Sequence, residues 1–121
     1  MATEADVVKV LRYMAAAWPR VEISEHTVAV YVMHMLRTGL AADVLLLAAM
    51  NLVDTMEFLP SVAEWRREAV CIQNEREVWY LTSNYRLHGY DLPERLALPE
   101  GVVEAVLRGH EPVGSLGGGA G

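Results

Sequence analysis

Residues 56–65 constrain the fold more than any other stretch, because they separate two apolar segments and set where one helix ends and the next begins. Pro60 disfavours helical geometry at the residue before it, so the preceding helix must end there. The Ser61 hydroxyl and the Glu64 carboxylate form an S-x-x-E capping box, which predicts a new helix directly after it. The side chains of Phe58 and Leu59, held in an extended link, are expected to fill the corner between the two helices.

The spacing of apolar residues predicts an all-α fold, a small bundle of four main helices followed by a short C-terminal one. Thr3, Ser24 and Ser61 are each placed to cap a helix start. The polar residues 73–77 are expected to be a solvated face, and the fourth helix is expected to bend or break near Asn74. The expected helices cover residues 3–18, 24–38, 40–55, 62–81 and 99–108.

Helix 40–55 is apolar nearly all round. Such a helix is either central in a bundle or buries its spare face in a partner, and the central position is the default. The predicted domain organisation is a helical bundle at residues 1–82, a partly ordered extension at 83–113 and a flexible, disordered Gly-rich tail at 114–121.

The charge balance disfavours nucleic acid as the main ligand. Ten Lys+Arg stand against sixteen Asp+Glu, a formal net charge of -6, and binding a phosphate backbone requires cations. Cys71 has no second cysteine to pair with and is expected to be a buried thiol in a reducing compartment. The N-terminus has no signal-peptide pattern, and the apolar run 44–50 is far short of the ~20 residues that span a bilayer. We therefore expect a cytoplasmic protein that does not enter a membrane.

A search for catalytic patterns gives no H-E-x-x-H, no cysteine pair, no phosphate-binding loop and no G-x-S-x-G. His26 and His34 are too far apart along a helix to share a metal. The sequence therefore predicts a non-enzymatic protein without metal or cofactor.

What remains is an interaction surface, because aromatic residues are over-represented at interface hot spots. Trp65 is expected to be a core residue. The candidate partner-binding residues are Trp79, Tyr80, Tyr85 and Tyr90.

The order of these parts resembles a known family. The shared features are Trp18-Pro19 after the first helix, residues 23–28, an aromatic at Tyr31, Ala48-Ala49 in the apolar helix, and residues 58–64. Over residues 5–72 the chain resembles the N-terminal domain of phage-encoded loaders and inhibitors of the replicative helicase. That family typically has tryptophan where this chain has Tyr31.

The resemblance implies a protein–protein function. A member of this family binds a ring-shaped hexameric helicase, holds it inactive, and delivers it to origin DNA through an origin-binding partner in phage or prophage replication. Family members use the C-terminal segment to contact the helicase. In this chain residues 78–107 are aromatic and apolar enough to be partly ordered. The helicase contact of the family is therefore not assigned to named positions here.

Two alternatives stay open at this stage. The first is a phage structural or assembly protein that forms a homo-oligomer through helix 40–55 and the Trp79-Tyr80 region. The second is a small helical DNA-binding regulator, which the shortage of Lys and Arg on any one helix disfavours.

Overall fold

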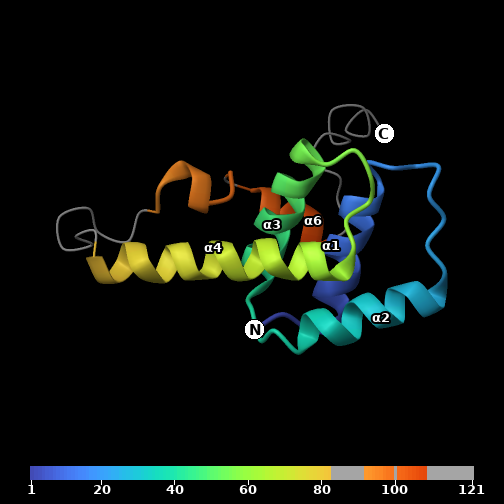
Figure 1. Cartoon of the computed structure of the whole chain (residues 1–121), viewed down its shortest axis with the longest axis horizontal. Coiled ribbons are helices and arrows are strands. Elements are labelled where there is room, and N and C mark those ends of the chain that lie inside the picture. Colours follow the sequence, from blue (N-terminus) through green and yellow to red (C-terminus); the bar gives the residue numbers. More distant parts are fainter. Residues whose placement is uncertain (83–91, 100, 109–121) are drawn as a thin grey trace.

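The computed structural model describes residues 1–82, 92–99 and 101–108. Within these residues the chain is helical and has no strand, as predicted. The elements are α1 (Glu4–Ala15), α2 (Glu25–Leu36), α3 (Ala42–Thr55), α4 (Val62–Thr82), the 3-10 helix η1 (Glu94–Leu96) and α6 (Val102–Leu107). α3 packs against α1 and α4, α2 packs against the same two helices from below, and η1 lies along α4 (Figure 1).

Three helices start where the capping side chains predict. The Thr3 hydroxyl accepts the N–H of Asp6 at 3.2 Å, and the Asp6 carboxylate accepts the N–H of Thr3 at 3.0 Å. The same reciprocal pair joins Ser61 and Glu64, at 3.1 and 2.8 Å. Ser24 accepts the backbone N–H three residues on at 3.1 Å. These bonds satisfy N–H groups that a helix start otherwise leaves without a partner.

The cap of α4 gives a stability prediction. We expect Ser61→Ala to lower the free energy of unfolding by about 0.5–2 kcal/mol, because the Glu64 N–H loses its acceptor. Urea denaturation followed by circular dichroism measures this difference. Arg66→Ala, a truncation to alanine at an exposed position of the same helix, is the control and should leave the midpoint nearly unchanged; an unchanged midpoint for Ser61→Ala would contradict the capping role.

The first helix ends earlier than predicted, at Ala15 rather than at Pro19. Beyond it the N–H of Trp18 bonds to the carbonyl of Ala15 at 3.0 Å, a tight turn instead of a further helical turn. The indole N–H of Trp18 donates to the carbonyl of Glu57 at 2.7 Å. This long-range bond ties the end of α1 to the α3–α4 link, and Trp18 is half-buried there as the expected anchor.

The predicted bend or break near Asn74 is wrong, because α4 is continuous from Val62 to Thr82. The polar run contributes bonds within the helix: Gln73 donates to Glu77 at 3.1 Å, four residues on. Such i,i+4 pairs support a helix rather than interrupt it.

α3 is the central helix, as predicted by default. Its apolar faces are covered by this chain's own α1 and α4. The indole N–H of Trp65 crosses from α4 and donates to the carbonyl of Leu45 at 3.0 Å. The buried residues of α3 are Val44, Leu45, Leu46, Leu47, Ala48, Ala49 and Leu52.

Arg76 corrects the prediction that residues 73–77 form a solvated face, since it is only 8% exposed. Its Nε donates to the carbonyl of Leu96 at 2.9 Å, and a terminal nitrogen donates to Asp43 at 2.7 Å. One guanidinium therefore joins α4, α3 and η1. A fork of several donors is what makes arginine suited to such a junction.

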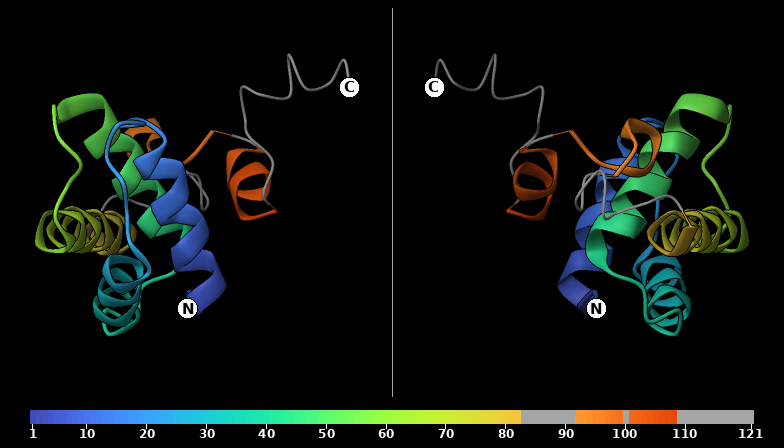
Figure 2. Two further views of the ribbon diagram at one scale, coloured as in Figure 1. Left: turned by 90° about the vertical axis from the view of Figure 1, so that its right-hand side faces the viewer. Right: turned by 90° about the vertical axis from the view of Figure 1, so that its left-hand side faces the viewer.

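The described part of the predicted extension packs on the bundle. Leu96 and Val106 are buried, and α6 lies against α1 (Figure 2). The Lys9 ammonium donates to the carbonyl of Leu107. The short C-terminal helix is confirmed as α6, whereas the predicted tail, residues 114–121, lies outside the described residues.

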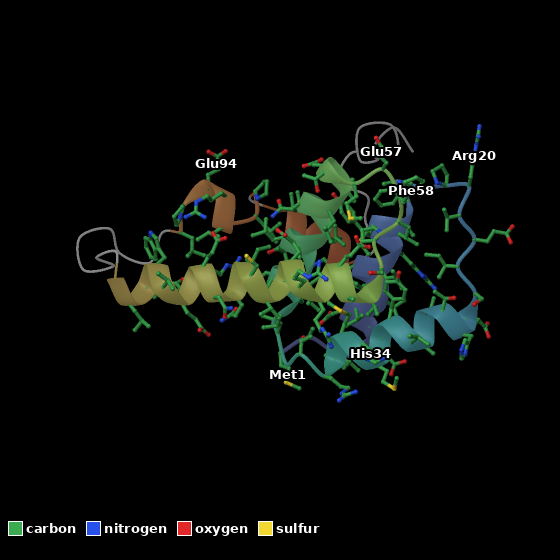
Figure 3. All side chains as sticks on the ribbon, in the orientation of Figure 1. Met1, Arg20, His34, Glu57, Phe58 and Glu94 are labelled. Atoms are coloured by element: carbon green, nitrogen blue, oxygen red, sulfur yellow. The ribbon has the colours of Figure 1, made fainter. Side chains whose placement is uncertain are left out.

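Phe58 does not fill the corner between α3 and α4, because its side chain is 74% exposed (Figure 3). Leu59, the second residue of this prediction, does pack against the core, and Pro60 beside it is buried. The Tyr31 hydroxyl donates to the carbonyl of Pro60 at 2.6 Å and holds the link in this orientation.

Candidate functional site

The C-terminal end of α4 carries the two predicted partner-binding residues that the structure describes. Trp79 is half-buried against the core and Tyr80 is 37% exposed. Their rings meet edge to face, with centroids 5.2 Å apart and an interplanar angle of 80°. Tyr85 and Tyr90 lie outside the described residues, so the predicted group of four is not tested as a group.

Aliphatic side chains flank this aromatic pair. Val78 is 58% and Leu81 is 85% exposed. We call Val78, Trp79, Tyr80 and Leu81 the aromatic end of α4. In Figure 1 this end of the helix extends past α1 and α3, while η1 lies beside it.

A shallow groove of about 380 Å³ runs along α4 beside η1. An ion pair between Glu75 and Arg95 spans it. The lining of the groove combines apolar side chains with one cationic and one anionic group. Its lining residues are Cys71, Asn74, Glu75, Val78, Trp79 and Arg95.

Cys71 is exposed, so the prediction of a buried thiol is wrong. The residue lies on the side of α4 turned away from Trp65 and Ile72, which take the buried positions. Desolvation raises the pKa of the Cys71 thiol, and the hydrogen bond to Glu75 and the charge of this carboxylate raise it further. A raised pKa reduces the thiolate fraction at neutral pH, which is the reactive form.

The predicted structural motif, residues Phe58, Pro60, Ser61 and Glu64, lies at the corner between α3 and α4. Hydrogen bonds from Ser61 lower the pKa of Glu64 below its ordinary 4.5, with a smaller contribution from the charge of Arg67. Because this pKa is lower in the folded chain than in the unfolded chain, the stabilisation by the Glu64 carboxylate is present above its ordinary pKa of 4.5 and is lost as the pH falls through the folded pKa. Pro60 is buried, whereas Phe58 is 74% exposed and does not contribute to the core.

Tyr31 stands at the aromatic position that the chain shares with the family it resembles. It lies beneath the corner between α3 and α4. Its ring centroid is 6.2 Å from that of Trp65. Desolvation raises the pKa of its hydroxyl, and the nearby Glu64 carboxylate raises it further. The hydroxyl therefore stays protonated and donates to the Pro60 carbonyl, a packing role rather than a catalytic one.

A second hollow, of about 490 Å³, lies between the end of α1 and the start of α2. Its walls are mainly apolar, with Arg12 and Glu25 as the charged groups. Among the residues that the structure describes, no group of three or more His, Cys, Asp and Glu is placed to hold a metal ion. No described helix has the length and apolarity needed to cross a membrane.

Sequence reasoning missed Arg76 as a junction and missed the exposure of Phe58. Neither has a local signal: the partners of Arg76 are 33 and 20 positions away, at Asp43 and Leu96. The exposed residues at 78, 80 and 81 could be found as a group, because apolar residues persist there after the polar run.

The described residues place the chain in the class of small helical bundles, with an exposed aromatic helix end. No protein-family model, curated protein or solved structure matches the chain.

Proposed function

We propose that this protein is a non-enzymatic adaptor that binds another protein through the aromatic end of α4. The observation that carries the proposal is the exposure of a tyrosine, a valine and a leucine around a half-buried tryptophan. Tryptophan and tyrosine are enriched among the few residues that supply most of the binding energy at protein interfaces. The half-buried Trp79 keeps this surface preformed, which reduces the entropy lost on binding.

The proposed partner is a hexameric replicative helicase, which the protein would load or inhibit during phage or prophage replication in the bacterial cytoplasm. The resemblance over residues 5–72 supports this choice of partner. The capping box at Ser61 and Glu64 and the central α3 agree with a bundle of the kind that the resemblance implies. An origin-binding protein would be the second partner in this scheme.

The charges support a protein partner over nucleic acid. The exposed cations of α4, Arg66 and Arg67, lie on a helix that also carries Glu64, Glu75 and Glu77. α4 therefore does not present the uniform basic face that binding a phosphate backbone requires. This disfavours the reading as a DNA-binding regulator.

The alternative of a self-associating assembly protein requires two interaction surfaces, and one of them is buried within the chain. It relied on α3 and on the Trp79-Tyr80 region, and α3 is covered within its own chain. Self-association through α3 would require the bundle to open.

The test is co-purification of the tagged chain with the replicative helicase of its own phage or host, with the ATPase rate as the second readout. We expect stoichiometric capture and a changed ATPase rate. Tyr80→Ala and Val78→Glu should each weaken capture by about tenfold or more, the range for hot-spot residues.

Met33→Glu is the matched control, since Met33 is an apolar residue of α2 that is 52% exposed. It should leave capture unchanged. Capture that is absent, or equally strong in all three variants, would contradict binding through the aromatic end of α4.

A further inference from the structure

The outer face of α4 carries a regular stripe of exposed residues, separate from the aromatic pair. The residues follow one another at spacings of four, three, four, three and four, the pattern by which one helix presents a seam to another. They lie opposite the buried Trp65, Ala69 and Ile72. The members of this stripe are Ala63, Arg67, Val70, Asn74, Glu77 and Leu81, all of them exposed.

We propose that two copies of the chain pair antiparallel through this stripe, about a two-fold axis near residue 72 of α4. The spacing reads the same from either end of the helix, so a two-fold rotation places the stripe on itself. Position 63 then meets 81 of the second copy, 67 meets 77, and 70 meets 74. Each contact occurs twice, as in any interface of this symmetry.

The side chains match in this register. Arg67 of one copy faces Glu77 of the other, giving two oppositely charged pairs. The small Ala63 faces Leu81, which is 85% exposed and needs the room. Val70 faces Asn74 beside the axis, so two Val–Asn contacts lie at the centre of the pairing.

A parallel pairing of the same stripe is disfavoured. It would place Arg67 against Arg67 and Glu77 against Glu77, and like charges in contact are destabilising. In the single chain, Glu77 accepts one hydrogen bond from Gln73, and Arg67 lies one helical turn from Glu64. Both side chains are nevertheless exposed on the outer side of α4.

The stripe is open in the described structure. Both views of Figure 2 show α4 at one edge of the molecule and α6 at the other, with no described segment outside α4. At 21 residues, α4 is about 30 Å long and straight, enough for all six contacts. The stripe shares Leu81 with the aromatic end of α4, but its charged residues Arg67 and Glu77 lie outside that end, so reversing their charges tests the pairing separately from the proposed function.

The test is the oligomeric state of the full chain by sedimentation equilibrium over a range of concentrations. We expect a dimer for the wild type and a dimer dissociation constant raised about tenfold or more for Arg67→Glu and for Glu77→Arg. The double variant Arg67→Glu/Glu77→Arg should recover the wild-type constant. An equimolar mixture of the two single variants should form a heterodimer, because each then meets the opposite charge twice.

Arg20→Glu and Glu57→Arg are the controls, with the same charge changes at exposed positions away from α4. They should dimerise as the wild type does, and circular dichroism should show the same helix content in all variants. A wild-type monomer at millimolar concentration overturns the pairing. So does a dimer that the single charge reversals leave intact, or a double variant that stays monomeric.

Discussion

Replacing Trp65 by alanine is expected to lower the free energy of unfolding by about 3–5 kcal/mol, the range for removing a large buried aromatic side chain. Trp65 is 0% exposed and packs from α4 against α3 and α2. Its indole N–H donates to the carbonyl of Leu45 at 3.0 Å, and its ring lies 6.2 Å from that of Tyr31. The alanine variant loses the packing and the hydrogen bond together, and leaves a cavity. Urea denaturation at neutral pH measures the loss.

Tyr80→Ala is the control for this experiment, since it removes an aromatic side chain of α4 at a partly exposed position. It should change the unfolding free energy far less. A cost below about 1 kcal/mol for Trp65→Ala would mean that the centre of the bundle is elsewhere.

Replacing Arg76 by alanine is expected to cost about 1.5–3 kcal/mol, the range for hydrogen bonds to a charged group. The bond to the carbonyl of Leu96 is buried, whereas the Asp43 side chain is 41% exposed, so water compensates part of the ion pair. The substitution should mainly weaken the packing of residues 92–99 against α4. Hydrogen exchange should therefore show faster exchange in that segment than in α3.

The matched variant is Arg95→Ala, which removes the neighbouring arginine and its exposed ion pair with Glu75. We expect it to cost less than about 1 kcal/mol, as exposed ion pairs do. Equal costs for the two arginines would contradict the role of Arg76 as the junction between α4, α3 and η1.

The helix starts were predictable because capping is local. Thr3 with Asp6, and Ser61 with Glu64, satisfy each other across three residues. No distant contact is needed for this, so the sequence pattern suffices. The end of α1 was mispredicted, since the bond from Trp18 to Glu57 spans 39 positions and has no counterpart in the local pattern.

The candidate site was predictable only in part. The aromatic pair Trp79 and Tyr80 follows from the sequence, but how far each ring is exposed depends on η1 and on the core. Cys71 was assigned to the core because its neighbours are apolar. The orientation of α4 about its own axis instead places Ala69 and Ile72 in the buried positions.

By itself the sequence determined the all-helical class and the helix caps, because each depends on bonds or periodicity within one helix, and it made the central position of α3 the default. Only the tertiary structure decided that Arg76 is buried, that Phe58 is exposed and that residues 92–99 and 101–108 contribute to the core. The reason is physical: burial is set by which segments meet across the fold. The energy of those contacts overrides what each residue type prefers on its own.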